Sequence, residues 1–452
     1  RLFKTLAEEG IKQPSINYAW NLLLEGSTLN VQPESKELQI ALFAPSYIAA
    51  AAHNHCSGSV FTLLTSRLFE VTGAEKENNY AFSSLTRGVL CVIPQEFDLR
   101  VRQIDVACSE DLKQLTNALK HEVSDRTMAV RNGRLWVETY EQGEAFTDYT
   151  TAVKNEGTYL VIGGTGVLGE LLSSNLLKNY HAHLILLGRR EESQVEDTLN
   201  AYRELGGQVS YVRGDITDID SFAAAFDQIK EMGLELDGIV HAGPSPNRNN
   251  YELLEDLTPL KACSIIQPKV DGLQNLYMLA KDMPLDFVWI NSSTASIVGG
   301  IAFGAYAASC SYADHFLRAH QSELPNWFTV QIGKFDEDAE EGDKDLKRNP
   351  LIFMNRQEFG RVFDATTVRD GDILLAVGKE NLTADMKAAQ EFRLIDAQNE
   401  EGGNSAVERI NRERPDLATD YRAPETEVEK AITDIVGGIL GMSGIGIDDS
   451  FI

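Results

Sequence analysis

The second half of the chain alternates short apolar runs with stretches of helical spacing. Runs of about four to six apolar residues are typical of buried strands, and they occur at Tyr159–Ile162, Leu184–Leu187, Val209–Val212, Gly238–His241, Phe287–Ile290 and Phe328–Ile332. Helices are predicted over residues 169–179, 197–206, 269–281 and 306–317, with one more ahead of Gly238. This alternation predicts right-handed βαβ units and a parallel sheet covered by helices on both faces.

The first half has a less regular pattern. Leu38–Phe43 and Gly88–Ile93 are apolar runs that we interpret as buried strands, and residues 111–123 have helical periodicity. Arg131–Arg134 (Arg-Asn-Gly-Arg) predicts a hairpin turn that leads into a strand over 135–139. We therefore expect mixed strands and helices here as well.

Polar stretches divide the remainder of the chain. Residues 336–349 carry many charges and are interpreted as a mobile loop, and residues 397–424 read as a linker. A short amphipathic helix is predicted over 425–440. The chain does not begin with Met and stops abruptly at Ile452, so we expect it to be a piece of a longer polypeptide.

Composition narrows the class of protein. The 452 residues suffice for roughly two to four domains, and 43% of them are hydrophobic. Lys and Arg number 41 against 68 Asp and Glu, a net charge of −27, so no nucleic-acid partner is expected, because a phosphate backbone binds a basic face. No membrane association is expected either, since no apolar run approaches the ~20 residues of a bilayer span and the charge disfavours anionic lipid.

Cysteine usage predicts a cytoplasmic protein without metal. The chain has five widely spaced cysteines and no Cys-x-x-Cys pair, which indicates buried thiols in a reducing compartment. One cluster, His53-Asn54-His55-Cys56, has metal-ligating residue types but no second ligand pair at zinc spacing. We interpret it as a helix end or turn and predict no metal site.

A glycine loop provides the first chemical signal. Residues 163–169 read Gly-Gly-Thr-Gly-Val-Leu-Gly, directly after a predicted strand and at the start of a predicted helix. Glycines in this setting let the backbone approach a pyrophosphate, which the helix N-terminus also attracts. The loop predicts a dinucleotide site, and its cofactor-binding residues are expected to be Gly163, Thr165, Gly166, Val167, Leu168 and Gly169.

The ends of the next strands favour NADPH. The second strand ends at Gly188 and is followed by Arg189 and Arg190, with no carboxylate until Glu191. A guanidinium suits the 2′-phosphate of NADPH, whereas a carboxylate would hold the ribose hydroxyl of NAD. Two solvated loop arginines are the alternative. At the end of the third strand, Asp215 and Ile216 are placed to flank an adenine.

Three further residues have the types that carbonyl reduction needs. Ser293 follows the predicted strand 287–290, Tyr306 opens a helix 13 residues later, and Lys269 lies 24 residues before Ser293 on a predicted helix. Hydride arriving at a carbonyl carbon builds negative charge on its oxygen. A phenol can protonate that oxygen, a serine hydroxyl can hold it, and an ammonium can lower the phenol pKa.

These segments resemble a known family. The motifs that carry the resemblance are residues 163–169, Gly188–Arg190, Gly214–Ile216, Val240–Gly243, Pro268–Gly272, Asn291–Ser293 and Gly304–Ala308. Together they resemble the ketoreductase domains of modular polyketide synthases, or of hybrid polyketide and nonribosomal peptide synthases, within the short-chain dehydrogenase/reductase superfamily. The lysine in Pro-Lys-Val-Asp-Gly, rather than four residues after the tyrosine, is particular to the ketoreductases of polyketide and fatty-acid synthases.

The resemblance implies a fold, a reaction and a division of the chain. It implies an α/β fold of two Rossmann-like subdomains, a truncated cofactor-free half and a catalytic half with a doubly wound parallel sheet. It implies Tyr306 as proton donor, Ser293 as holder of the substrate oxygen and Lys269 in support, with His241, Ala242 and Gly243 beside the cofactor. The expected divisions are a linker (1–37), a structural subdomain (38–152), a catalytic subdomain (153–395), a linker (396–424) and the start of a carrier domain (425–452).

The chain departs from the family pattern at some positions. Four residues after Tyr306 the family usually has Asn, and here the residue is Cys310, a weaker hydrogen-bonding group, so the support given by Lys269 is in question.

The loop after His241 reads Ala-Gly-Pro-Ser-Pro and lacks the Leu-Asp-Asp of one stereochemical class, which favours the L-hydroxy class. The class without Leu-Asp-Asp is marked by a tryptophan eight residues before Tyr306, and in this chain that residue is Val298.

The leading hypothesis is therefore NADPH-dependent, stereoselective reduction of a keto group on an acyl thioester that is tethered to a carrier protein, among neighbouring synthase domains. The keto group is β in the common case and α where peptide and polyketide modules meet. A free short-chain dehydrogenase that acts on a small ketone, and a structural domain that binds NADPH without reducing, are the alternatives.

Overall fold

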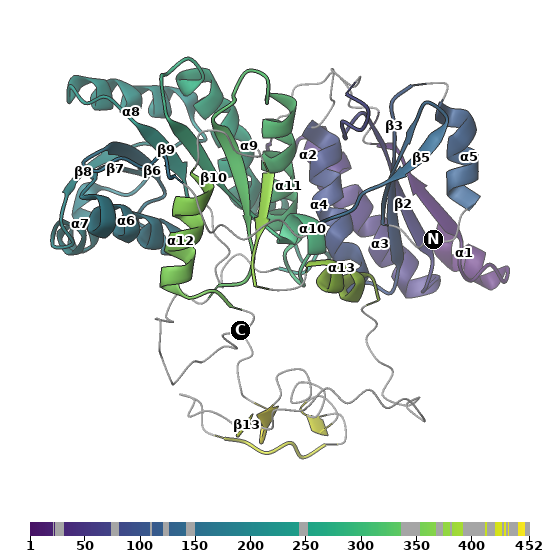
Figure 1. Ribbon diagram of the computed structural model, residues 1–452. Coiled ribbons are helices and arrows are strands. Elements are labelled where there is room, and N and C mark those ends of the chain that lie inside the picture. The colour runs from purple at the N-terminus through teal and green to yellow at the C-terminus, as the bar shows by residue number, and fades with distance from the viewer. Residues whose placement is uncertain are drawn as a thin grey trace. The chain divides into compact units, whose positions relative to one another are not determined.

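The chain divides into two compact units, Arg1–Phe392 and Arg393–Ile452. The first unit holds two large sheets (Figure 1). In the second, the short strands β13 (Arg412–Glu413) and β14 (Met442–Ser443) pair in parallel. The computed structural model describes residues 1–20, 22, 31–73, 81–108, 111–120, 126–141, 150–243, 252–335, 353–367, 374–379, 382–391, 412–413, 421–426, 429–430, 433 and 442–447. The predicted loop 336–349 lies outside them, as do most of the predicted linker 397–424 and helix 425–440.

The larger sheet has seven parallel strands in the order β12-β11-β10-β9-β6-β7-β8. Their bounds are β6 (Thr158–Ile162), β7 (His183–Gly188), β8 (Gln208–Arg213), β9 (Gly238–His241), β10 (Phe287–Ser293), β11 (Trp327–Ile332) and β12 (Leu374–Val377). The chain order reverses between β6 and β9. In open parallel sheets this is the point where ligands bind, at the carboxyl ends of the strands.

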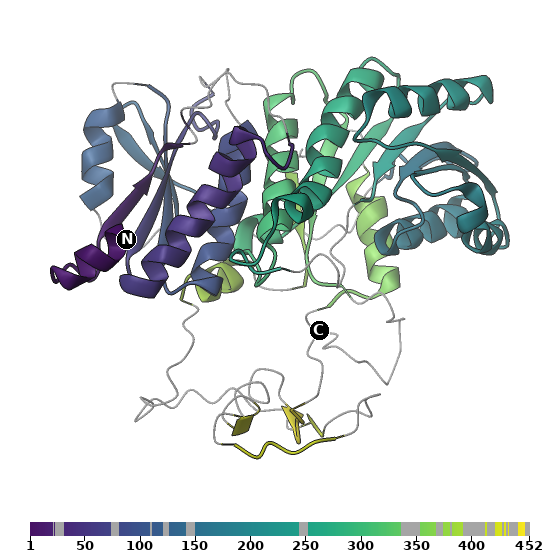
Figure 2. The ribbon, with the colours of Figure 1, turned by 180° about the vertical axis from the view of Figure 1, so that it is seen from behind.

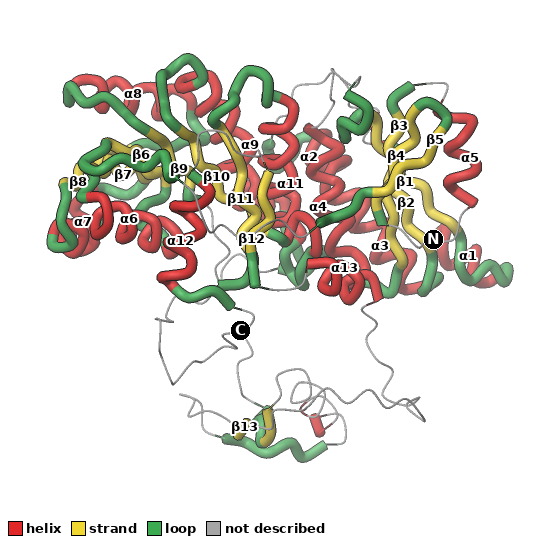
Figure 3. Tube along the Cα trace, in the orientation of Figure 1, coloured by secondary structure: helices red, strands yellow, loops and turns green. Residues whose placement is uncertain are grey.

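Helices cover both faces of this sheet (Figure 3). Alternate residues of β6 point to opposite faces: Tyr159 and Val161 belong to one apolar core, and Leu160 and Ile162 to another. The first core is completed by α6 (Val167–Tyr180), α7 (Glu196–Arg203) and α12 (Arg356–Thr366). The second is completed by α8 (Ile219–Glu231), α9 (Pro259–Ala280) and α11 (Gly304–Ala319). The α/β fold expected for this half is confirmed.

Helix α9 begins ten residues earlier than the sequence predicts. Pro268 lies inside it, and a proline is normally taken as a helix boundary. The true start is marked by Thr258, whose side chain accepts a hydrogen bond from the Lys261 backbone N–H, and by Pro259 at the first helical position.

The smaller sheet has five strands in the order β1-β2-β3-β4-β5. Their bounds are β1 (Ser15–Tyr18), β2 (Val60–Ser66), β3 (Arg100–Val106), β4 (Thr127–Arg131) and β5 (Arg134–Val137). The first four are parallel, and β5 returns antiparallel to β4 with Arg131 opposite Arg134, which confirms the predicted hairpin. Its helices are α1 (Leu2–Glu8), α2 (Lys36–Leu38), α3 (Ala44–His55), α4 (Ala81–Glu96) and α5 (Leu112–Lys120).

Two predicted strands of this half are wrong. Leu38–Phe43 is helical, at the end of α2 and in a π-helical turn over Gln39–Phe43, and Gly88–Ile93 lies inside α4. A helix that is buried on every side has an unbroken apolar run, which periodicity alone does not distinguish from a buried strand. In addition, β1 extends the sheet from within residues 1–37, which the sequence analysis assigns to a linker.

The two sheets are joined by a helix–helix contact. Helix α4 packs against α11 (Figures 1 and 2), so closely that a Cβ added to Gly88 would lie 2.5 Å from the Ala307 carbonyl carbon. Hydrogen bonds run from Cys91 and Arg126 to carbonyls of the short helix α10 (Ala295–Val298). One apolar core therefore continues from the smaller sheet into the helices of the larger one.

Candidate active site

The glycine loop joins β6 to α6 at the reversal point of the sheet. Gly163 has φ +78°, a left-handed conformation that favours glycine, and its carbonyl accepts a hydrogen bond from the Gly166 N–H (3.0 Å). Gly166 caps α6, and Val167 at the first helical position is 41% exposed. The free N–H groups of this helix end are therefore open to an anionic ligand.

The third glycine of the loop is required by close packing. A Cβ added to Gly169 would lie 2.6 Å from the Gly164 Cα and would also collide with the Gly163 carbonyl oxygen. Gly163 in turn approaches the end of β9, where an added Cβ would lie 3.3 Å from the Gly243 nitrogen. The loop, the start of α6 and residues 242–243 form one tightly fitted backbone cradle, which fits a dinucleotide pyrophosphate.

Guanidinium groups gather beside this cradle. Arg189 and Arg190 are exposed after β7, and the Arg190 Nη2 donates to the Thr165 Oγ1 (2.7 Å). Arg213, at the end of β8, donates from Nε to the Arg189 carbonyl (3.2 Å) and pairs with Glu191 (2.7 Å). Arg213 was not among the residues predicted from the sequence. The exposed Arg189 lies next to this pair, at a strand end where a guanidinium can bind an anion.

The other predicted cofactor residues lie at the neighbouring strand ends. The Asp215 Oδ1 accepts from the backbone N–H and the hydroxyl of Thr217 (3.0 and 2.8 Å). Ile216 is 8% exposed, and its carbonyl accepts from Asn275 on α9 (2.8 Å). The His241 imidazole is fully buried, with Nε2 3.2 Å from the Pro268 carbonyl, so backbone atoms of residues 241–243 are what this strand end offers a cofactor.

The three predicted catalytic residues converge from three elements. Ser293 ends β10, Tyr306 lies in the first turn of α11, and Lys269 lies on α9. The Lys269 Nζ lies 5.7 Å from the centre of the Tyr306 ring, and the Tyr306 hydroxyl lies close enough to Ser293, Asn291 and Cys310 for side-chain hydrogen bonding. The Ser293 hydroxyl accepts from the Ala295 N–H (3.1 Å), which orients it.

Burial sets the protonation states of this group. It raises the pKa of Tyr306 well above the ordinary value, although Ser293 and Asn291 act in the opposite direction, so the phenol keeps its proton at neutral pH. Burial lowers the pKa of Lys269, and the nearby Cys310 and Asp314 counteract this. Burial and Lys269 lower the pKa of His241 to about 4, so that imidazole is neutral.

Cys310 contributes a neutral thiol where the family pattern has Asn. It is fully buried, and burial raises its pKa. The Lys269 Nζ is also fully buried and has no hydrogen-bond partner among the described residues. A buried ammonium without a bonded partner is costly.

A metal-ligating cluster and a membrane-spanning helix are both absent from the part of the chain that the structure describes. His53, His55 and Cys56 lie at the end of α3, and no group of three metal-ligating side chains is found among the described residues. No described helix is both long and apolar enough to cross a membrane. Residues 244–251, which follow the predicted cofactor residues 241–243, lie outside the described residues.

A seven-stranded parallel sheet with a glycine loop at its reversal point, and with Ser, Tyr and Lys at its carboxyl edge, defines an oxidoreductase of the short-chain dehydrogenase/reductase superfamily. Residues 157–337 match the family model described as "KR domain". This part of the chain is a ketoreductase domain of the polyketide synthase type, and domains of this class bind a nicotinamide cofactor.

Relatives and solved structures agree with this assignment. The chain is 28% identical over 226 residues to polyketide synthase PksN of Bacillus subtilis (48% of this chain, 4% of that protein). It is 34% identical over 158 residues to polyketide synthase ThaG of Burkholderia thailandensis (34% and 3%). It therefore spans only a small fraction of these relatives.

Two structures share its fold at lower identity. A C2-type ketoreductase from a modular polyketide synthase has a TM-score of 0.68 at 17% identity, covering 86% of this chain and 84% of that one. A structure with adenylation, ketoreductase and pseudo Asub domains, from a keto acid-selecting nonribosomal peptide synthetase module, has a TM-score of 0.68 at 22% identity, covering 98% and 38%.

Proposed function

We propose that the chain catalyses the NADPH-dependent, stereoselective reduction of a keto group on a carrier-bound acyl thioester during polyketide assembly. The observation that carries this proposal is the convergence of Tyr306, Ser293 and Lys269 at the carboxyl edge of the sheet that also holds the glycine loop. A serine and a protonated phenol side by side fit the oxygen of a ketone, because both can donate a hydrogen bond to it.

Each residue has a distinct role in this reaction. The nicotinamide, when bound, supplies a hydride to the carbonyl carbon. The Ser293 hydroxyl holds the carbonyl oxygen, and Tyr306 gives its proton to that oxygen as the C–O double bond becomes a single bond, which yields the alcohol. The resulting phenolate is stabilised by the Lys269 ammonium until a proton from solvent restores the phenol.

NADPH is proposed as the cofactor because of the charges beside the cradle. The glycine loop and the α6 N-terminus would bind the pyrophosphate, and Arg189 would bind the 2′-phosphate. Arg190 is held against Thr165 of the loop, and Arg213 pairs with the Glu191 carboxylate. The cluster is locally basic in a chain of net charge −27.

The substrate is proposed to be a β-keto acyl thioester, with an α-keto thioester as the second candidate. The second is favoured by one observation: the solved module whose fold covers 98% of this chain is described as keto acid-selecting. The absence of Leu-Asp-Asp after His241 favours an L-hydroxy product.

The partners are proposed to be neighbouring synthase domains and a carrier domain whose first helix lies within 425–452. Carrier domains are commonly acidic, so the docking surface on this acidic chain would be a local basic or apolar patch. We also propose a cytoplasmic location, on the basis of the cysteine pattern.

The test is Tyr306→Phe with a panel of β- and α-keto thioesters and NADPH absorbance as the readout. Loss of the proton donor is expected to reduce the rate by roughly 10²–10⁴-fold while NADPH still binds. Tyr277→Phe is the matched control, since it removes a phenol hydroxyl from α9 that donates to the exposed Glu323 carboxylate (2.7 Å).

The alternatives predict other outcomes. Turnover of small free ketones in preference to thioesters would favour a free dehydrogenase. NADPH binding by the wild-type chain without turnover would favour a structural role. An undiminished rate in Tyr306→Phe would contradict the assignment of the proton donor.

A further inference from the structure

Asp314 is a buried carboxylate to which the proposed reaction gives no role. It is 3% exposed and lies on α11. Tyr306, Cys310 and Asp314 are spaced at i, i+4 and i+8, so they share one face of the helix. Helix α11 packs against α9, which carries Lys269.

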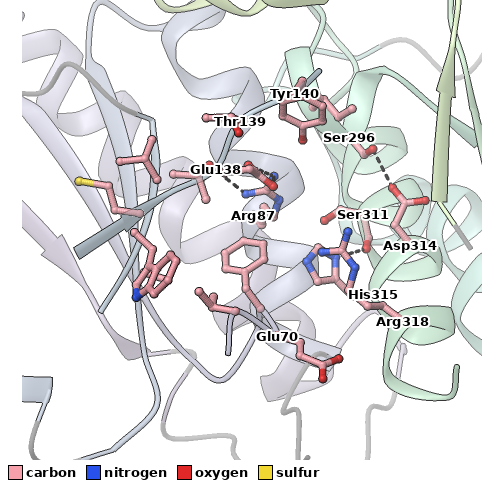
Figure 4. Close-up of a pocket in the computed structure, with 18 of the residues that line it drawn as sticks. Glu70, Arg87, Glu138, Thr139, Tyr140, Ser296, Ser311, Asp314, His315 and Arg318 are labelled. Carbon is pink, nitrogen blue, oxygen red and sulfur yellow. Dashed lines mark hydrogen bonds and ion pairs between the residues drawn. The ribbon is translucent and has the colours of Figure 1, made fainter. Parts of the chain in front are cut away.

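The carboxylate connects the elements that carry the catalytic residues. The Asp314 Oδ2 accepts from the Ser296 hydroxyl (2.8 Å; Figure 4) and from the Gln331 Nε2 on β11 (2.7 Å). Ser296 belongs to α10, directly after Ser293, and its Oγ lies 2.9 Å from the Ser293 carbonyl oxygen. Asp314 therefore fixes the helix that presents Tyr306 against the strand end that presents Ser293.

Asp314 also lies within electrostatic range of the buried ammonium of Lys269, without a direct ion pair: the Asp314 Oδ1 and the Lys269 Nζ each lack a hydrogen-bond partner among the described residues. The groups that raise the pKa of Lys269 against the effect of burial are Cys310 and Asp314. The other titratable groups that face Lys269 are neutral: Cys310 and Tyr306 on α11 have raised pKa values, and His241 on β9 has a pKa of about 4. Burial raises the pKa of Asp314 as well, and the hydrogen bonds from Ser296 and Gln331 act against this by favouring the charged carboxylate. Because of these two donors, Asp314 is the group of this set that we assign as the counterion of Lys269.

On its other side Asp314 lines a cavity of about 300 Å³ between the two sheets (Figure 4). The opposite wall carries Arg87, which is paired with Glu138 (3.0 Å). Burial and the guanidinium groups of Arg87 and Arg318 hold the pKa of His315 well below its ordinary value, so it is neutral. The remaining titratable groups of the lining are Glu70 and Tyr140.

We propose that Asp314 is a positioning residue of the ketoreductase site: its carboxylate keeps Lys269 in the charged form and holds α11 in register with Ser293. The kinetic consequence of this inference rests on the proposed function, whereas its electrostatic consequence rests on the burial of both groups and on the packing of α11 against α9. The two consequences are tested separately.

The kinetic test is the pH profile of Asp314→Asn, which keeps the shape of the side chain and removes its charge. Loss of a nearby negative charge favours deprotonation of both Lys269 and Tyr306. The alkaline limb of the rate profile is therefore expected to move to lower pH by about one unit or more. Asp364→Asn is the matched control, because it neutralises a half-buried carboxylate on α12 that accepts from Asn175 (2.9 Å), away from the site; its alkaline limb is expected to match the wild type.

The electrostatic test uses NMR titration of the lysine side-chain Cε signals, with Lys269 assigned from Lys269→Arg. The Lys269 midpoint is expected to fall by about one pH unit or more in Asp314→Asn, whether or not the wild-type chain reduces a ketone. If Asp314→Asn does not fold, Ser296→Ala is used instead, because it removes one of the two hydrogen-bond donors to the Asp314 carboxylate. The Lys269 midpoint is then expected to fall by a smaller amount.

The outcomes are distinct. An unmoved Lys269 midpoint, together with a rate loss that is equal at every pH, would overturn the inference and leave a purely structural role. A wild-type chain without ketone reduction but with the expected NMR shift would contradict the proposed function and leave the electrostatic inference standing.

Discussion

Replacing Gly169 by Ala tests the cofactor cradle most specifically. The added methyl carbon would lie 2.6 Å from the Gly164 Cα and would also overlap the Gly163 carbonyl. Both obstacles are backbone atoms, so the loop must move away from α6. Overpacking of this kind costs about 1–3 kcal/mol of the free energy of unfolding.

The larger effect is expected on cofactor binding. If the displaced loop loses one N–H bond to the pyrophosphate, worth about 1.5–3 kcal/mol for a charged acceptor, the Kd for NADPH rises roughly tenfold to 150-fold. Fluorescence titration with NADPH measures this, and urea unfolding measures the stability of the same sample.

Gly238→Ala is the matched control for this test. Gly238 starts β9 at the opposite end of the sheet, and its added Cβ would lie 2.9 Å from the Phe287 ring. We expect this variant to lose comparable stability with an unchanged Kd. If Gly169→Ala behaves like Gly238→Ala, losing stability and keeping its NADPH affinity, the reasoning about the cradle is refuted.

Three further predictions concern charge. Arg189→Ala is expected to raise the Kd for NADPH about tenfold or more and to leave the Kd for NADH unchanged, as measured by fluorescence titration. Arg203→Ala, which removes an exposed side chain of α7, should change neither Kd. Asp105→Ala leaves the guanidinium of Arg131 buried without its ion-pair partner, and urea unfolding is expected to show a loss of about 3–5 kcal/mol. Burial raises the pKa of Asp271 to about 7, so the folded chain keeps a proton that the unfolded chain releases above about pH 4. Stability is then lost as the pH rises from about 4 to 7, and Asp271→Asn is expected to exceed the wild type in stability above pH 7, with no such gain below about pH 4; equal stability curves would contradict this.

The fold of the catalytic half could be predicted because its pattern is unambiguous. Strands buried on both faces give short, continuous apolar runs, and the helices between them keep the 3.6-residue period. The start of α9 was missed because Pro268 looks like a boundary, although the helix continues through it.

The secondary structure of the N-terminal half was harder to predict, for a physical reason. Helix α4 is enclosed by its own sheet and by α11, so the apolar run Gly88–Ile93 is buried throughout. Such a run has no exposed polar positions to reveal the helical period. Conversely, β3 carries the buried polar residues Arg102, Gln103 and Asp105, which interrupt the apolar run that a strand prediction needs.

The residues of the candidate site also fall into two groups, those that local motifs predict and those that only the tertiary structure reveals. The glycine loop and the Ser, Tyr and Lys positions are local motifs, and the structure brings those three side chains together. Arg213 was missed because its relation to Arg189 depends on strand pairing, in which Gly188 lies opposite Arg213. The contact of Asp314 with Ser296 depends on tertiary packing, although its i+8 spacing from Tyr306 was a visible signal.

The most direct test of the central claim follows the hydride itself. The wild-type chain is incubated with a keto thioester and with NADPH that carries deuterium at the transferable position, and the product is analysed by mass spectrometry and chiral chromatography. The account predicts one deuterium on the carbinol carbon of a single alcohol stereoisomer, with label transfer falling by roughly 10²–10⁴-fold in Tyr306→Phe. Bound NADPH with no deuterium in the thioester would contradict it.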